Sequence, residues 1–151
     1  MDSAQDRARA VEAVRSLARA SSMLERSSPQ LSLAHYRVLA AIAQGNERAS
    51  NVARRLAIGK PAVSVAVESL CQRGLLARSG VAGDQRVVAL HLTPEGEALL
   101  DQVETEMISR INDLCDRTPD GEQLIESLVW LGAAMDSRVA DRLAARRSEA
   151  R

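Results

Sequence analysis

The sequence is poor in aromatic residues. Among its 151 residues there is no Phe, one Tyr and one Trp, although 46% of the residues are apolar. The core must therefore be built from Leu, Val, Ile, Ala and Met, a set that favours helices. A chain of this length and apolar content can bury a core as one domain or as two short subdomains, which argues against disorder.

Cysteine, histidine and long apolar runs are also scarce. Cys71 and Cys115 lie 44 positions apart without CxxC spacing, and His35 and His91 lack companion ligands, so we expect buried thiols, no metal and no cofactor. No apolar run approaches the roughly 20 residues that span a bilayer. The N-terminal stretch MDSAQDRARA is charged where a signal peptide would be apolar. We therefore expect a cytoplasmic protein.

The net charge is zero, but the charges are unevenly distributed. Residues 47–93 hold seven basic and three acidic side chains, whereas residues 94–136 hold two basic and eleven acidic ones. The remaining blocks, residues 1–46 and 137–151, carry +2 and +3. A basic central segment next to an acidic helical segment indicates a module that binds a polyanion, joined to a part that does not bind it. The alternative is that these charges only solvate helix faces.

The spacing of apolar residues predicts a series of helices. Three- and four-residue steps recur over residues 5–26, 33–43 and 52–56. Gly59 interrupts the pattern before a fourth helix, and Gly74 fits the C-terminal cap of that helix. The sequence therefore predicts two short helices, over residues 33–43 and 52–56, followed after Gly59 by a fourth helix.

That fourth helix holds Lys60, the only lysine of the chain. On a helical wheel Val63, Ala66, Val67 and Leu70 face inward. The opposite face is made of small side chains that let a helix enter the major groove, while Lys60 and the amides of the first turn meet phosphates at its rim. These outer residues are Pro61, Ala62, Ser64, Val65, Glu68 and Ser69. The alternative is an ordinary surface helix.

A β-hairpin is predicted after this helix. Gly80 and Gly83 flank a turn, and Val88, Leu90 and Leu92 recur at every second position, so they should share one buried face of a strand. Helix, break, helix and a two-stranded hairpin together form the layout of a winged helix-turn-helix.

Two long helices complete the prediction. Thr93-Pro94-Glu95 is a strong helix start, from which a helix should run to about Arg117. This helix and the last helix each carry an apolar seam, and the first helix is amphipathic. Together these apolar faces are larger than the central module can cover, so we expect a homodimer, with a monomeric bundle as the alternative. The residues expected at the dimer interface are Val11, Val14, Leu17, Ile111, Leu114, Leu124, Leu128, Leu131, Met135 and Val139.

Four stretches carry a family resemblance: residues 52–58, 63–70, 73–78 and above all 83–96. The last one, GDQRVVALHLTPEG, has an Asp-x-Arg tip followed by a strand that ends Leu-Thr-x-x-Gly. In these features the chain resembles the multiple-antibiotic-resistance regulator (MarR) family of bacterial transcription factors.

The resemblance implies a mainly α fold with a small β-hairpin wing. Residues 31–96 would form the winged helix-turn-helix DNA-binding domain, and residues 1–30 and 97–151 the helical dimerisation region. It further implies a symmetric dimer that represses transcription from a palindromic operator. A small, often phenolic or amphipathic molecule would relieve repression by binding between the two parts.

Site residues follow from the resemblance and from the outer face of the fourth helix. Arg86 would enter the minor groove from the wing tip, with Asp84 orienting it. Val65 stands where many relatives have a long polar side chain and can read only apolar contact, so we expect specificity to come largely from the wing and the half-site spacing. The expected DNA contacts are Ser50, Asn51, Lys60, Pro61, Ser64, Val65, Ser69, Arg78, Asp84 and Arg86. The expected effector pocket comprises Met23, His35, Tyr36, Leu39, Met107 and Arg110.

Several alternatives remain. Arg110 could hold a ligand carboxylate, but an ion pair with Glu106 is expected instead. The protein could be a winged-helix dimer that acts as a protein-interaction adaptor through its acidic C-terminal half, or a redox-responsive regulator that uses Cys71 or Cys115. Catalysis is not expected, because the sequence has no nucleophile elbow, phosphate-binding glycine loop or HExxH motif.

Overall fold

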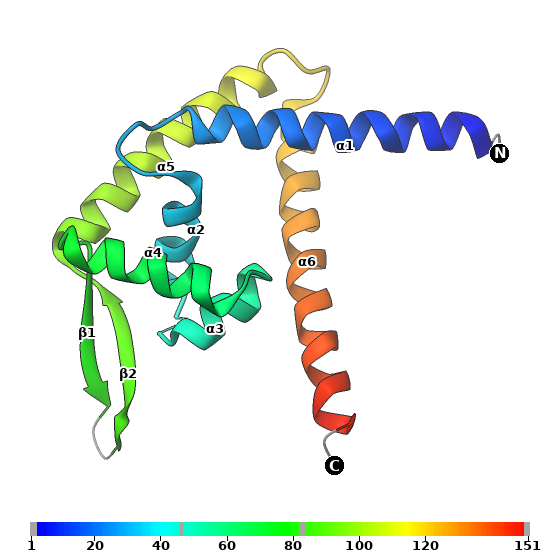
Figure 1. Cartoon of the computed structure of the whole chain (residues 1–151). Helices are drawn as coiled ribbons and strands as arrows, with labels where there is room; N and C mark the ends of the chain where they lie inside the picture. Colours follow the sequence, from blue (N-terminus) through cyan, green and yellow to red (C-terminus); the bar gives the residue numbers. More distant parts are fainter. Residues whose placement is uncertain (1–2, 46, 82–83, 150–151) are drawn as a thin grey trace.

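The computed structural model describes residues 3–45, 47–81 and 84–149, with the side chains of residues 3, 81, 84–87, 143, 146, 147 and 149 outside the description. Helices and one hairpin follow one another in chain order (Figure 1). Their bounds are α1 (Ser3–Glu25), α2 (Leu33–Ala43), α3 (Ala49–Leu56), α4 (Lys60–Gln72), β1 (Leu76–Val81), β2 (Asp84–Leu92), α5 (Pro94–Cys115) and α6 (Gly121–Glu149). The predicted mainly helical fold with a hairpin wing is confirmed.

The helix-turn-helix consists of α3 and α4. Helix α3 ends at Leu56, and its C-cap residue Ala57 adopts a left-handed conformation with φ of 54°. Gly59 is the N-cap of α4, and Gly74, with φ of 72°, lies in the turn just after that helix, as its predicted capping role requires. The apolar residues over 52–56 that predicted this helix lie within α3, which begins at Ala49.

The wing is an antiparallel pair of strands in which Leu76 lies opposite Leu92 and Gly80 lies opposite Val88. The sequence predicted one buried face formed by Val88, Leu90 and Leu92, and this is wrong at Val88. Leu90 is buried and Leu92 is partly buried, but Val88 is exposed. Val88 lies further out along the hairpin than Leu90 and Leu92, and the hairpin projects below the helices (Figure 1).

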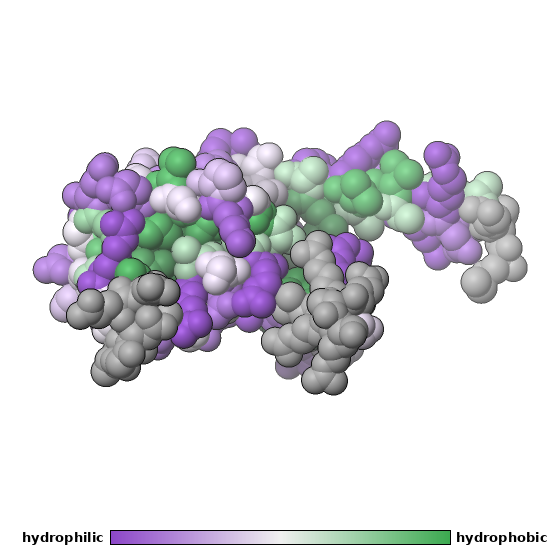
Figure 2. Space-filling view, turned by 60° about the horizontal axis from the view of Figure 1, so that its bottom comes forward, coloured by the Kyte–Doolittle hydropathy of each residue, from purple (hydrophilic) through white to green (hydrophobic). Residues whose placement is uncertain are grey.

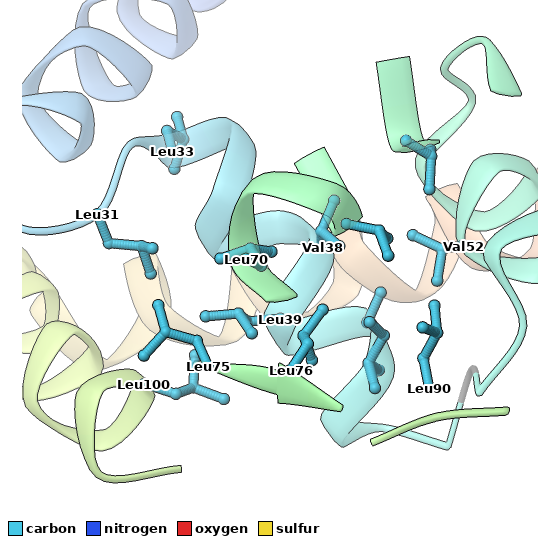
Figure 3. Close-up of a cluster of buried hydrophobic side chains, with 14 of the residues drawn as sticks. Leu31, Leu33, Val38, Leu39, Val52, Leu70, Leu75, Leu76, Leu90 and Leu100 are labelled. Carbon is cyan, nitrogen blue, oxygen red and sulfur yellow. The ribbon is translucent and has the colours of Figure 1, made fainter. Parts of the chain in front are cut away.

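A single apolar core joins the helix-turn-helix, the base of the wing and the first half of α5. Leu39 of α2, Val52 of α3 and Leu70 of α4 are all fully buried, and Leu100 of α5 packs beside Leu75 (Figure 3). Val103 and Met107, one and two turns further along α5, belong to the same core. Helix α5 is thereby fixed to the body that carries α4 and the wing.

The junction between β2 and α5 is held by Thr93. Its Oγ1 accepts a hydrogen bond from the Gly96 amide at 3.0 Å, which confirms the predicted N-cap, and donates one to the Gly74 carbonyl at 2.6 Å. The Thr93 amide donates to the Leu75 carbonyl at 3.2 Å. The start of α5 is therefore tied to the end of α4.

Helices α1 and α6 extend away from this body. Helix α1 projects to one side, and α6 descends past α3 toward the side on which the wing tip lies (Figure 1). Both helices leave many apolar side chains exposed. Within the described ranges, no helix combines the length and apolar character that crossing a membrane requires.

Candidate nucleic-acid interface

The outer face of α4 is small and exposed, as predicted. Val63, Val67 and Leu70 are buried and anchor the helix to the core. Ser64 is exposed, and Val65 keeps 71% of its surface accessible, so both side chains can reach a partner. Further predicted contacts on α4 are Lys60 and Pro61, which are exposed, and Ser69, which is partly buried.

A groove of about 860 Å³ lies between α4 and the wing. It brings together four of the predicted DNA contacts: Ser64, Val65, Ser69 and Arg78. Val88 lines it from β2, so the side chain that fails to pack in the core forms part of this surface instead. Seen with the bottom of Figure 1 brought forward, apolar side chains lie exposed among polar ones on this side of the molecule (Figure 2). Valine side chains here suit contact with thymine methyl groups.

Arg78, expected to hold a phosphate, is paired with an acid in the free protein. Its Nη2 donates to Glu68 Oε2 at 2.8 Å, and both side chains are about half exposed. The hydrogen bond and charge of Arg78 lower the pKa of the Glu68 carboxyl, and the same hydrogen bond raises the pKa of Arg78. A phosphate that binds Arg78 must therefore compete with Glu68.

A second group of predicted contacts lies on the other side of α4. Ser50 and Lys60 line a cavity of about 330 Å³ together with Arg54 of α3 and Arg142 of α6. Asn51 lies next to them and accepts a hydrogen bond from Arg54. Arg54 and Arg142 were not among the predicted contacts. The positive charge of residues 137–151 was a signal for Arg142, but nothing in the sequence indicated that α6 returns to α3.

The remaining predicted DNA contacts are at the wing tip. Asp84 and Arg86 belong to β2, but their side chains lie outside the described part of the structure. Their roles stay predictions.

The six residues expected to form an effector pocket are not gathered around one cavity. Leu39 is fully buried and Met107 is buried in the core. Tyr36 is half-buried and donates to Glu104 Oε1 at 3.4 Å; burial, followed by the charge of Glu104, raises the pKa of Tyr36. Met23 lines a separate cavity of about 610 Å³ between α1 and Leu114.

Two further members of this set, His35 and Arg110, carry ionisable side chains. Burial, and then the charge of Arg73, lowers the pKa of His35, which favours its neutral form. The predicted ion pair between Arg110 and Glu106 is wrong: Glu106 Oε1 accepts from Gln102 at 3.1 Å, and its Oε2 is buried without a partner. Among the described residues Arg110 forms no ion pair.

The residues expected at a dimer interface lie on α1, α5 and α6. Those exposed in the single chain are Val14, Leu17, Leu114, Leu128, Leu131 and Met135. The others, which are partly buried, are Val11, Ile111, Leu124 and Val139. Trp130, the only tryptophan of the chain, is 62% exposed on α6 and was not among the predicted interface residues.

Cysteine and acidic residues give no further site in the described ranges. Cys71 and Cys115 are both free and partly buried. No group of three His, Cys, Asp or Glu side chains there is arranged to hold a metal ion.

Comparisons with known proteins agree on one fold. Residues 30–87 match the sequence model of the MarR family, whereas no curated protein matches the chain. The transcriptional regulator BldR from Sulfolobus solfataricus superposes with a TM-score of 0.70 at 20% identity, over 89% of this chain and 99% of its own. BpsR from Bordetella bronchiseptica, whose DNA binding is regulated by 6-hydroxynicotinic acid, gives 0.67 at 25% identity, over 83% and 91%. Apo wild-type MarR from E. coli gives 0.66 at 20% identity, over 82% and 92%.

Proposed function

Since the chain is a MarR-family DNA-binding transcriptional regulator, we propose that it is a cytoplasmic homodimer that represses transcription from a palindromic operator. A small molecule that binds the dimer releases it from the DNA. Residues 31–96 make the DNA contacts, and the helices outside that range hold the two subunits together. The family match agrees with the expectation that the chain is not an enzyme.

The observation that carries this proposal is the surface formed by α4 and the wing. Ser64, Val65 and Val88 line an open groove, and Arg78 stands at the same groove while Lys60 lies at the beginning of α4. A narrow helix with small side chains between cationic side chains is suited to the major groove, where bases are read at the centre and phosphates at the rim.

Dimerisation is supported by the apolar surface of the first and last helices. Val14 is 67% exposed on α1, and the part of α6 between Leu124 and Met135 carries apolar residues on nearly every side. Figure 2 shows apolar side chains along the projecting α1. A surface of this kind needs a cover in water, and a second copy provides a symmetric one.

A salt titration tests DNA binding. The full chain is titrated onto fluorescent duplexes selected from genomic DNA, between about 50 and 200 mM salt, with Lys60→Gln as a variant that removes one phosphate contact per subunit. We expect the affinity to fall by orders of magnitude across this range and the variant to fall less steeply. Affinity that is weak and independent of both salt and Lys60 would favour the adaptor alternative instead.

The effector is proposed to be a small amphipathic molecule that binds near α1, α2 and α5. The DNA binding of BpsR is regulated by an aromatic acid, 6-hydroxynicotinic acid. In this chain Tyr36 is half-buried, and Arg110 forms no ion pair with another described residue. A thermal-shift screen of phenols and aromatic carboxylates tests this. A compound that stabilises the protein should also weaken operator binding, and for a carboxylate both effects should shrink in Arg110→Gln. If no compound in the panel does both, the proposed release mechanism is wrong.

A further inference from the structure

The second half of α6 lies beside the helix-turn-helix. Arg55 of α3 joins the two, because its Nη2 donates to Asp136 Oδ2 at 3.2 Å and to Gln44 Oε1 at 2.7 Å. Beyond Asp136 the helix continues along α3 and ends on the side toward which the wing also projects (Figure 1). The helix-turn-helix is thus flanked by the wing on one side and by the end of α6 on the other.

The charge of α6 changes sign where the helix reaches α3. Residues 121–136 contain three acidic and no basic side chains, whereas residues 137–149 contain four basic and two acidic ones. Arg138, Arg142 and Arg146 follow one another at four-residue steps, a spacing that places residues on one face of a helix. Asp136, at the end of the acidic half, pairs with Arg55 of α3, so the basic half begins where the helix reaches the helix-turn-helix.

Positive groups from three helices meet there. Arg142, Arg54 and Lys60 line the same cavity of about 330 Å³, whose remaining wall includes Ser50 and Val139. Arg54 is hydrogen-bonded to Asn51, and neither Lys60 nor Arg142 forms an ion pair within the part of the chain that the structure describes. Like charges brought together without acids between them attract an anion, and the free amides at the N-terminus of α4 add to that attraction.

We infer that the basic end of α6 is a further DNA-binding element, in which Arg142 binds a phosphate of the same duplex that α4 and the wing contact. This inference rests on the proposed function, because Ser50 and Lys60 are the phosphate contacts on the other wall of the cavity. A DNA strand held by those two residues passes within reach of Arg142. The last helix then has two roles: its apolar first half joins the subunits, and its basic second half joins the protein to DNA.

Arginine near the C-terminus of a helix also complements the helix dipole. That role is local to the protein, so it would leave the salt dependence of DNA binding unchanged. A salt titration of DNA binding therefore distinguishes phosphate binding by Arg142 from a purely structural role, which a measurement of protein stability alone would not do.

The experiment compares Arg142→Gln with the full-length wild type on one duplex selected from genomic DNA. Loss of one phosphate contact per subunit should reduce the slope of log affinity against log salt by about 0.9 per subunit, and the affinity near 0.1 M salt by roughly tenfold or more. Sequence preference should not change, because phosphate contacts carry no direct sequence information. Arg142→Lys should keep most of the slope. Arg15→Gln, the same substitution on α1, is the matched control and should behave as the wild type.

Two results are decisive against the inference. Arg142→Gln could show the wild-type slope while Lys60→Gln shows a reduced one, in which case α4 binds DNA without the help of α6. Alternatively, Arg142→Lys could lose as much slope as Arg142→Gln while both remain folded dimers, which would make Arg142 a structural residue. Failure of the proposed function looks different, because then the wild type itself shows no salt-dependent binding.

Discussion

Glu68 is an acidic residue on the face of α4 that is proposed to meet DNA. In the free protein it holds Arg78 at 2.8 Å, and this contact keeps the pKa of its carboxyl below the usual range, so it stays charged at neutral pH. A fixed negative charge on this face opposes the approach of phosphates and competes for the arginine that should bind them.

Replacing Glu68 with Gln should therefore strengthen DNA binding. The amide keeps the size of the side chain but removes the charge and frees Arg78. We expect the affinity for a selected duplex to rise roughly threefold to tenfold at low salt, with a smaller gain at high salt because the effect is screened. Fluorescence anisotropy measures it, and Glu126→Gln on α6 is the matched control. Unchanged or weaker binding would mean that the pair positions Arg78 for DNA.

Gly96 shows why a short motif has a strict residue requirement. A Cβ atom at this position would overlap the backbone carbonyl of Leu75, the same group that accepts a hydrogen bond from the Thr93 amide. Backbone atoms cannot move aside as the end of a side chain can. The glycine at the end of the Leu-Thr-x-x-Gly pattern thus allows α5 to start directly against the end of α4.

Gly96→Ala should lower the free energy of unfolding by about 2 to 3 kcal/mol, as overpacking of a close contact does. Gly80→Ala is the control, since a Cβ there meets nothing within 4 Å, and it should change stability by no more than about 0.5 kcal/mol. Urea denaturation followed by circular dichroism gives both values. Equal stability of the two variants would show that the junction can open at little cost.

Local features of the sequence were enough to predict several residues correctly. Thr93 caps α5, and Gly74 adopts its left-handed conformation after α4, because both roles depend on neighbours within a few positions. The pairing of Arg78 with Glu68 and the meeting of Arg54 with Arg142 were not predicted. These contacts depend on how separate elements are placed in space, which residue spacing along the chain does not encode.

At the scale of elements, α4 and the wing act as one surface because they share a groove. Helix α4 presents Ser64 and Val65, which would give few distinctive hydrogen bonds to bases. The alternation of β2 predicted a buried strand face, but Val88 is exposed in this groove, since it lies further along the projecting hairpin than Leu90 and Leu92. The alternating pattern correctly predicted a strand, but it could not show which residues of each strand face would be buried.

Sequence preference should therefore depend more on Arg86 than on Ser64. Footprinting on a selected operator should show that Arg86→Ala loses more of the difference between operator and unrelated DNA than Ser64→Ala does, because a guanidinium reads the width of the minor groove. A larger loss in Ser64→Ala would place the specificity in α4.

Helix α5 belongs to both parts of the molecule. Leu100, Val103 and Met107 lie in the core with α2 and α4, whereas Leu114 near its end is exposed. Its regular apolar spacing correctly predicted one continuous helix, but that spacing is the same whether the partner is the helix's own chain or another. The sequence therefore could not show where packing within the subunit ends.

At the scale of the whole molecule, the single chain leaves an apolar surface exposed on α1 and α6, which we propose a second copy covers. Leu128 and Leu131 are both exposed on α6, and Leu17 is exposed on α1. Burying such side chains contributes about 25 cal/mol for each Å² removed from water. In the proposed dimer the same helices set the distance between the two DNA-binding modules, so dimerisation and operator binding should be lost together.

The double substitution Leu128→Glu with Leu131→Glu should give monomers and reduce operator affinity by at least about 100-fold, because each module then binds its half-site alone. Gln123→Glu, on the same helix but outside the apolar seam, is the control and should remain dimeric. Size-exclusion chromatography with light scattering measures the mass. A dimeric double variant would place the interface elsewhere.

The most direct measurement is sedimentation equilibrium of the full chain, alone and with a duplex selected from genomic DNA. We expect a species of twice the 16.3 kDa chain mass, which binds one duplex per dimer and dissociates from the duplex as salt rises. A species of 16.3 kDa at all concentrations, or a dimer that binds heparin and every duplex equally well, would contradict it.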